Sequence, residues 1–396
     1  MRISSNTIFA SGVTRLADLQ SNIVKTQQQI STGHRILSPS DDPTGSARAL
    51  DLSQSQSINT QFGTNRQAAS NSLTIEESTL QGTTSLLQDV KTLAISAGDA
   101  AYSDADRLSI ATDLRGRLDE LLSQANATDG IGNYIFAGFQ VTAPPFSSAA
   151  TGAQYSGDQG QRLAQVGTSR QIAVSDTGNA VFQNIRNSGA QVTAAAAGST
   201  GSVSALSADG SATPTGHDYD IRFTSTTQFD IFDVTANAAV ATGQTYTAGQ
   251  PISFDGVQLT VSGTPSASDR FTVRTPAHQS VFTTISDLIT ALETPLSGVA
   301  GKAAFSKALS LANGNLDNAL DNVLTVRASI GSRLKEIDSL NTSGEDRNFQ
   351  LTSVLSQIQD VDYTKAISDF TQQNTNLEAA QKTFVKVSGL SLFSLI

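Results

Sequence analysis

The sequence predicts a multidomain α+β protein in which long helices at both ends of the chain enclose a β-rich insert. Apolar residues recur every seven positions near both ends, which is the a/d pattern of helices that wrap around a partner helix. Between the ends the pattern changes to an alternation of apolar and polar residues, the period of a half-buried strand. If the β-rich part is a single insertion, the helices before and after it must pack together.

The first helix is expected to end at Thr32. Phe9, Leu16, Ile23 and Ile30 are spaced by seven, with Leu19 three positions after Leu16. These five side chains contribute at most about 8–15 kcal/mol when buried, whereas fixing about twenty backbone units costs ~1–2 kcal/mol each. Alone, such a helix should fray. Most apolar heptad stripes are the core of an ordinary helical bundle, but stripes that run to both chain ends favour contacts between molecules.

The polar segment "SPSDDP" separates this helix from the next one. Asp42 is the expected N-cap, Pro43 occupies the favoured first helical position, and Asp41 complements the helix dipole. With Pro39 they form a predicted loop and helix restart.

Two further helices are predicted before the insert. The first carries a seven-residue repeat, and the second carries a regular a/d series; their apolar residues are Leu73, Leu80 and Leu87, and Ala111, Leu114, Leu118, Leu121 and Ala125.

The middle of the chain predicts strands. "DYDIRF" (218–223) alternates apolar and charged residues, and "PISFDGVQLTV" (251–261) places an Asp-Gly pair between two alternating runs, a strong hairpin signal. Another strand is expected at 271–273. The small-residue segment 193–216 is expected to be a flexible linker or long surface loop.

The C-terminal part repeats the heptad pattern in two phases. Val323, Ile330, Ile337, Leu351 and Ile358 keep a seven-residue spacing with Gly344 as the gap. Val354 occupies an intervening position, whereas Arg333 and Arg347 interrupt such positions. After "QDVDY" the phase resets to Phe370, Leu377 and Phe384, joined by Ile367, Ala380 and Val387. A phase reset predicts a joint or a change of partner face.

We expect three domains: a terminal coiled-coil assembly domain (1–42 with 346–396), a helical rod domain (43–142 with 276–345) and a β-rich outer domain (143–275). The expected assembly contacts are Phe9, Leu16, Leu19, Ile23, Ile30, Leu351, Val354, Ile358, Ile367, Phe370, Leu377, Phe384 and Val387.

No chemistry-bearing constellation emerges from the sequence. Net charge −10 argues against nucleic acid, and without cysteine there are no thiolate ligands or nucleophiles. The three histidines, His34, His217 and His278, share no ligand spacing. The pair Asp41–Asp42 is better explained as cap and dipole partners than as catalysts, and "GDQG" (157–160) as a tight turn than as a calcium loop. We therefore expect no catalytic, cofactor or metal site, and hence no enzyme.

The localisation signals are equally plain. No apolar run approaches the ~20 residues of a membrane span, and the N-terminus lacks the apolar core of a signal peptide. Taken alone, the chain would be cytoplasmic, or exported by a route that reads another signal. Hydrophobic residues at 38% and charged residues at 15% suit a secreted appendage better than a compact enzyme core.

Several motifs resemble the bacterial flagellin superfamily. "MRISSNTIF" (1–9) and "QQQISTGHRILSPSDDPTGSARAL" (27–50) are similar to its N-terminus. The "SPSDDP" form, "NYIFAGF" with "PPF" (133–146), "YSGDQGQR" (155–162) and "NLEAAQKTFVKVSGLSLFSLI" (376–396) resemble its hook–filament junction branch. "GTPSASDRFTV" (263–273) looks like a strand motif of hook-associated proteins. The likeness covers both helical ends, roughly half the chain.

The resemblance implies a structural adaptor that polymerises in a helical ring or tube between hook and filament. Its implied partners are the other hook-associated junction protein, flagellin and an export chaperone. The implied location is the extracellular flagellum, reached through the flagellar type III apparatus without a cleaved signal, and "SPSDDP" would be the hinge into a second helical layer. The alternatives are flagellin itself, a secreted adhesin or hydrolase carried by the β insert, and a cytoplasmic coiled-coil scaffold.

Overall fold

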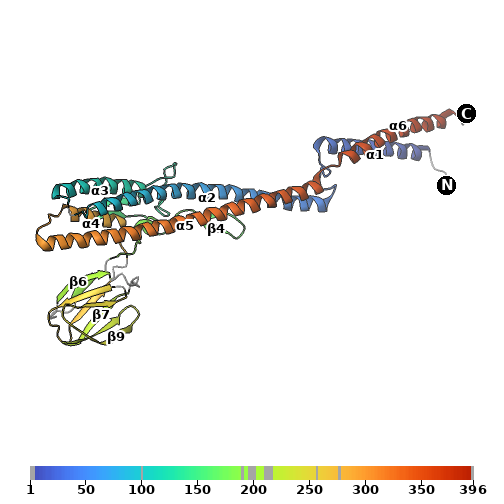
Figure 1. The fold of residues 1–396 in the computed structure, drawn as a ribbon. Helices are drawn as coiled ribbons and strands as arrows, with labels where there is room; N and C mark the ends of the chain where they lie inside the picture. Colours follow the sequence, from blue (N-terminus) through green and yellow to red (C-terminus); the bar gives the residue numbers. More distant parts are fainter. Residues whose placement is uncertain are drawn as a thin grey trace. The chain divides into compact units, whose positions relative to one another are not determined.

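The computed structural model describes residues 5–99, 101–188, 191–194, 202–208, 217–255, 257–274 and 278–393. The chain forms two compact units, whose elements are drawn in Figure 1. The first unit comprises Met1–Arg66, Val166–Ser169 and Asp338–Ile396, and the second comprises Gln67–Gln165 and Arg170–Ile337. Mostly helical structure with a central β-rich region confirms the predicted fold class.

The first unit is helical. It holds α1 (Ser5–Thr32), α6 (Tyr363–Phe393), the beginning of α2 (Pro43–Ser96) and the end of α5 (Gly298–Gln359). Helix α1 ends where Gly33 adopts φ +75°, a left-handed conformation that glycine takes without strain. Helix α5 ends at Gln359 and α6 begins at Tyr363, so the joint predicted from the phase reset is confirmed.

Gly344, the gap in the heptad series of α5, lies beside polar side chains of α2. Asn59 Nδ2 of α2 donates to the Gly344 carbonyl oxygen at 2.8 Å. A Cβ atom at position 344 would collide with the Arg66 guanidinium. The missing side chain therefore makes room for two polar residues of the neighbouring helix.

The helical part of the second unit contains the remaining lengths of α2 and α5 together with α3 (Asp104–Ala125) and α4 (Val281–Glu293). Ser103 and Asp106 form a capping box at the start of α3, which satisfies free amide groups of its first turn. The predicted heptad positions are buried, including Leu73, Leu80, Leu87, Leu114, Leu121, Val323, Ile330 and Ile337. These stripes are ordinary intramolecular core, the alternative that the sequence left open.

Two small hairpins follow: β1 (Phe146–Ala149) with β2 (Gly152–Tyr155), and β3 (Leu163–Gln165) with β4 (Gln171–Ala173). The first hairpin contacts α3 and α4, and the second is bonded to α5 through Arg333 and the Ala173 carbonyl oxygen. The π-helix η1 (Asn179–Gln183) follows. The rings of Phe146, Phe182 and Phe282 form an aromatic cluster with centroids 5.1–5.9 Å apart. Gly152 has φ +104°, and a Cβ there would lie 2.6 Å from the Phe282 backbone, so this turn requires glycine.

The remaining strands form a β-sandwich. Strands β5 (Gln191–Ala194), β12 (Arg270–Arg274), β7 (Tyr219–Ser225), β8 (Gln228–Asp233) and β9 (Ala238–Thr245) make a five-stranded sheet in that order. Strands β10 (Pro251–Phe254), β11 (Val257–Ser262) and β6 (Ser202–Ala208) make the second sheet. Antiparallel pairs join neighbours, with Phe254 opposite Val257 across the Asp-Gly turn. The strands predicted at 218–223, 251–261 and 271–273 are confirmed.

One expectation for this region is wrong. Segment 193–216 was expected to be a linker or loop, but β6 and the end of β5 lie within it. Strand β6 contains small residues that carry little strand signal, and pairing with β11 supplies its order. Residues 195–201 and 209–216 of the segment lie outside the described residues. The domain boundaries at 42/43, 142/143, 275/276 and 345/346 stay predictions.

Candidate functional site

The two terminal helices of the first unit, α1 and α6, pack along one another in antiparallel order (Figure 1). Near their free ends the Phe9 and Phe384 rings are 5.2 Å apart. Nearer the joint, the Thr26 hydroxyl lies 3.1 Å from Gln373 Oε1. A Cβ at Gly12 would lie 2.7 Å from the Phe384 ring, so a helical glycine creates the space that this ring occupies.

Most of the predicted assembly residues on these helices belong to this pair. On α1, the less exposed positions recur at intervals of three and four, the face that α6 covers. Seven predicted residues are half-buried: Leu16, Leu19, Ile23, Ile30, Phe370, Leu377 and Phe384. On the end of α5, Leu351, Val354 and Ile358 are half-buried as well. The structure thus brings the predicted α1 and α6 stripes together within one chain.

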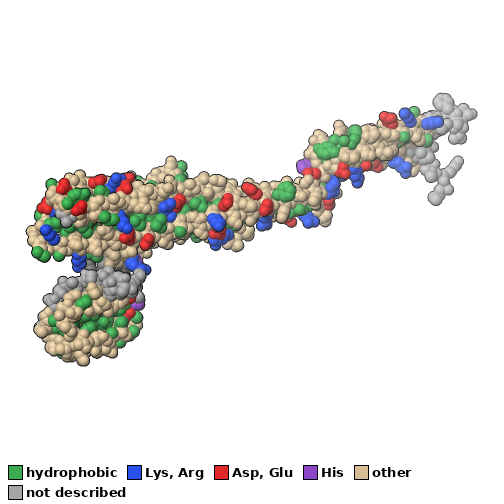
Figure 2. Space-filling model, viewed as in Figure 1, with side chains coloured by type: hydrophobic (Ala, Val, Ile, Leu, Met, Phe, Trp, Pro, Cys, Tyr) green, Lys and Arg blue, Asp and Glu red, His purple; other side chains and the backbone are tan. Residues whose placement is uncertain are grey.

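Other apolar side chains of the terminal helices remain exposed. Among the predicted residues, Phe9 is 54%, Ile367 53% and Val387 46% exposed. Sequence reasoning missed a further set that lies off the heptad stripe: Val13, Val24, Tyr363 and Val385. The sequence feature that could have revealed them is an apolar residue at a position where a two-helix pair in water would carry a charged one. Figure 2 shows apolar side chains gathered over α1 and α6 among scattered charges.

In the first unit, the connection between α1 and α2 is hydrogen-bonded to the connection between α5 and α6. The Arg35 amide donates to the Gln359 carbonyl oxygen at 2.6 Å, and the Val361 amide donates to the Gly33 carbonyl oxygen at 2.9 Å. Arg35 Nη2 donates to the Ile358 carbonyl oxygen at 2.9 Å and lies 3.1 Å from Asp42 Oδ2. These bonds hold the α1–α2 connection against the α5–α6 connection, so the predicted hinge is a hydrogen-bonded joint.

The predicted cap residues lie in this joint, with one difference. Asp42 Oδ1 accepts the Gly45 amide at 2.9 Å, and this bond lowers the pKa of the Asp42 carboxyl. Pro39 occupies a turn closed by the Asp41 amide and the Ser38 carbonyl oxygen. Asp41 was expected to complement the dipole of the following helix. Its carboxylate instead accepts the Leu37 and Ser38 amides and pairs with Lys25 at 2.7 Å.

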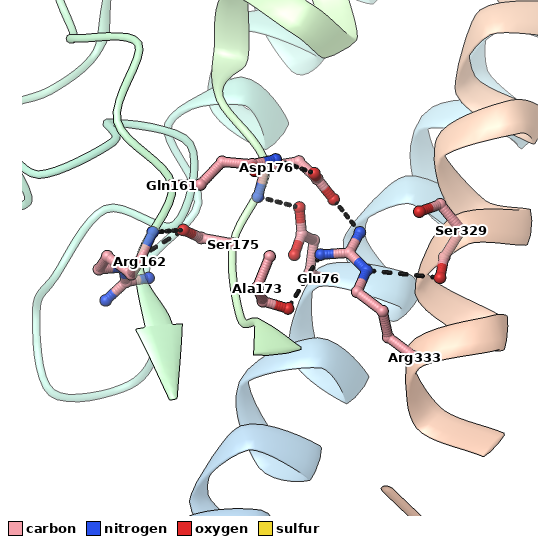
Figure 3. Close-up of polar contacts among 8 residues, drawn as sticks. All are labelled: Glu76, Gln161, Arg162, Ala173, Ser175, Asp176, Ser329 and Arg333. Atoms are coloured by element: carbon pink, nitrogen blue, oxygen red, sulfur yellow. Dashed lines mark hydrogen bonds and ion pairs between the residues drawn. The ribbon is translucent and has the colours of Figure 1, made fainter. Parts of the chain in front are cut away.

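The second unit holds a buried polar cluster that the sequence did not predict (Figure 3). Glu76 of α2 is 1% exposed, and its Oε1 accepts the Asp176 amide at 3.0 Å. Its Oε2 has no hydrogen-bond partner among the described residues. Burial raises the pKa of Glu76 to about 8, and the Asp176 charge adds to the shift. Arg333 of α5 pairs with Asp176 and donates to the Ala173 carbonyl oxygen at 3.0 Å.

Within the described part of the chain, no group of three or more His, Cys, Asp or Glu residues could hold a metal ion. His217 lies 2.7 Å from Asp233, and His34 lies 3.8 Å from Asp360, so each of these two imidazoles lies beside a carboxylate. The "GDQG" segment is a turn in which Asp158 Oδ1 accepts the Gly160 amide at 2.7 Å. None of the described helices combines the length and apolarity that crossing a membrane would need.

Three family profiles match the chain. The bacterial flagellin N-terminal helical region matches residues 3–141, and the bacterial flagellin C-terminal helical region matches residues 314–396. Between them, the D2-like domain of flagellar hook-associated protein 1 matches residues 186–275. The two flagellin regions include the paired α1 and α6, and the D2-like match covers the sandwich.

Individual proteins are similar over greater lengths. Flagellar hook-associated protein 3 of Salmonella typhimurium is 30% identical over 396 residues, which cover 100% of this chain and 99% of that protein. The crystal structure of Xanthomonas campestris FlgL, 30% identical, aligns with a TM-score of 0.59 over 77% of this chain and 99% of that one. The flagellar junction protein FlgL from Legionella pneumophila, 27% identical, aligns with a TM-score of 0.58 over 79% and 99%.

Proposed function

Because the chain belongs to the family of flagellar hook-associated protein 3, we propose that it is a structural adaptor of the bacterial flagellum. It joins the hook to the flagellin filament by polymerising through its terminal helices. The observation that carries the proposal is the relationship to the Salmonella protein over the whole of both chains. A match confined to the helical ends would have suited flagellin equally well.

The geometry of the first unit supports polymerisation through α1 and α6. The two helices pair with each other and leave apolar side chains such as Phe9, Ile367 and Val385 uncovered. Two helices alone cannot bury every face of either one, so neighbouring copies would cover these side chains. In this proposal residues 1–42 and 346–396 form the assembly domain, residues 43–142 and 276–345 the rod, and residues 143–275 the outer part.

The finer parts of the proposal concern partners and export. The partners are the other hook-associated junction protein on the hook side, flagellin on the filament side, and an export chaperone before assembly. The chain reaches the extracellular flagellum through the flagellar export apparatus. We propose no enzymatic role.

Flagellin is the second candidate, because the flagellin profiles match both helical ends. Deletion of the gene separates the two candidates. Under our proposal, microscopy should show bare hooks, and a blot of the medium should detect soluble flagellin. Lost filaments without flagellin in the medium would identify this chain as the filament subunit, and normal flagella would exclude both roles.

A substitution tests the terminal helices directly. Leu377→Asp places a charge in the half-buried α1–α6 contact, so we expect a folded soluble protein that is absent from sheared flagella. Gln381→Asp, at an exposed position of the same helix, is the matched control and should be incorporated. Normal incorporation of the Leu377→Asp protein would contradict the assembly role of these helices.

A further inference from the structure

The first unit contains a cavity lined by the beginning of α2 and the end of α5. Its volume is about 400 Å³, within the range of ligand-binding pockets. Segment 166–168, which follows β3, lines it as well. Two irregularities in the heptad pattern of α5 meet here, because Gly344, the gap in the series, and Arg347, which interrupts it, both line the cavity. The break in the apolar pattern of α5 thus coincides with a hollow beside α2.

The cavity carries positive charge without a carboxylate. Of the described residues that line it, only Arg66 and Arg347 are ionisable, although the whole chain has net charge −10. Neither arginine forms an ion pair with any carboxylate in the described part of the chain. Two cations that share one cavity and lack a countercharge favour an anionic ligand.

Arg66 is the more deeply buried of the two cations. It is 5% exposed, so its guanidinium has lost most of its contact with water. Its Nε donates to Asn341 Oδ1 at 2.6 Å, and its Nη1 donates to the Val166 carbonyl oxygen at 3.1 Å. Both acceptors are neutral, and Nη2 has no acceptor among the described residues.

The electrostatics of Arg66 agree with this geometry. Burial lowers the pKa of Arg66, and the charge of Glu345 opposes part of that shift. The guanidinium nevertheless stays protonated, as arginine does throughout proteins. A buried cation held by neutral acceptors is stabilised by an anion that reaches its remaining donors.

The walls of the cavity narrow the class of anion. Ile58, Phe62 and Leu340 line it together with Arg66, and Ile58 is 46% exposed. An inorganic anion would leave this apolar surface in contact with water. An apolar chain attached to a carboxylate would cover the surface while the carboxylate reaches the guanidinium groups.

We infer that this cavity binds a small ionised carboxylic acid with a short apolar chain. The carboxylate would accept hydrogen bonds from Arg66 Nη2 and from the Arg347 guanidinium, and the apolar chain would lie along Phe62 and Leu340. An acidic side chain of another protein fits less well, because its one or two methylene groups would leave most of the 400 Å³ unfilled. The inference does not depend on a role between hook and filament.

The test uses the full chain and hexanoate, with binding measured by isothermal titration calorimetry. We expect saturable binding with a Kd below about 1 mM. Two analogues separate the contributions of charge and chain: hexanamide has the same shape without the charge, and acetate has the charge without the longer chain. Each should bind at least about tenfold more weakly than hexanoate.

Substitutions assign the binding to this cavity. Arg66→Met should weaken hexanoate binding at least about tenfold, and Arg347→Gln, at an exposed position, about three- to fivefold. Glu345→Gln should tighten it, because a negative charge that acts on Arg66 is removed. Arg48→Met is the matched control, since Arg48 is exposed on α2 and lies outside the cavity, and it should bind as the parent does. All four proteins should keep the circular dichroism spectrum of the parent.

Three results would overturn the inference. The first is absence of binding at about 10 mM hexanoate, or equal binding of hexanamide. The second is an unchanged Kd in the Arg66→Met protein or, if that protein does not fold, in both the Arg347→Gln and the Glu345→Gln proteins. The third is a dimer in sedimentation that hexanoate disrupts and that the Arg66→Met protein does not form, which would make an acidic side chain of a second copy the occupant.

Discussion

Replacing Glu76 with glutamine should stabilise the second unit at neutral pH. The Glu76 carboxyl is 1% exposed, and one of its oxygens has no partner among the described residues. Its pKa rises from the ordinary 4.5 to about 8 because burial disfavours the charged form. The folded protein thus holds this proton more tightly than the unfolded chain. The stability it contributes is complete below about pH 4.5 and is lost as the pH rises through about 8.

The size of this stabilisation follows from the pH range over which the unfolded chain is ionised at Glu76 and the folded protein is not. Between the ordinary pKa of 4.5 and about pH 7.5 lie about three pH units, each worth ~1.4 kcal/mol, so the wild-type unit loses roughly 4 kcal/mol over this range. Glutamine keeps the shape and the acceptor for the Asp176 amide but does not ionise. The Glu76→Gln protein should therefore exceed the wild type by up to roughly 4 kcal/mol at about pH 7.5.

The assay is urea denaturation followed by circular dichroism at several pH values from about 5 to 9. The wild-type free energy of unfolding should fall with pH more steeply than that of the Glu76→Gln protein. Glu77→Gln is the control, because it alters the neighbouring ion pair with Arg327 and should cost at most about 1 kcal/mol. Parallel pH profiles for the wild-type and Glu76→Gln proteins would refute the reasoning.

Three further predictions concern other parts of the chain. Gly152→Ala should lower the free energy of unfolding by about 2–4 kcal/mol, since φ of Gly152 is +104° and the added Cβ would meet the Phe282 backbone. Gly116→Ala is the control: no atom lies within 4 Å of its added Cβ, so it should raise the free energy of unfolding by up to about 1 kcal/mol. Equal melting curves for the two proteins would contradict both expectations. Asp42→Ala removes the cap of α2 and should cost about 1 kcal/mol, seen as faster amide exchange at Gly45; unchanged exchange there would argue against the cap. Ile367→Asp, at a 53% exposed position, should leave thermal unfolding of the monomer unchanged yet reduce incorporation into flagella; a lower melting temperature would mean that Ile367 acts within the chain.

The sequence predicts the helical parts well because heptad spacing and helix-end chemistry are local properties. The break at Gly33, the restart at Pro43 and the joint after Gln359 all depend on residues next to each break. Strand β6 was missed because its small residues become a strand through pairing with β11, and pairing of that kind leaves no local pattern.

The parts of the candidate site that depend on local sequence could be predicted, and those that depend on packing could not. The stripes of α1 and α6 follow from spacing alone, whereas the side chains that remain exposed beside them depend on how two helices pack. The Glu76 cluster was missed because it joins residues 100 and 157 positions apart. Arg333 seemed merely to interrupt a heptad series, although its side chain lies against Asp176. The bonds of Asp41 to the Leu37 and Ser38 amides and to Lys25 were not predicted, because they depend on how the loop folds back on α1.

The antiparallel pairing of α1 with α6 also ties the first unit to the order in which the chain is made. Thr26 and its contact Gln373 are 347 positions apart, so α1 leaves the ribosome long before the helix that covers it. Contacts of such separation form late in folding. A molecule cut short before α6 would carry an uncovered α1 and could not present the two-helix surface. Under the proposed assembly role, neighbouring copies would therefore recognise only those molecules that carry both helices.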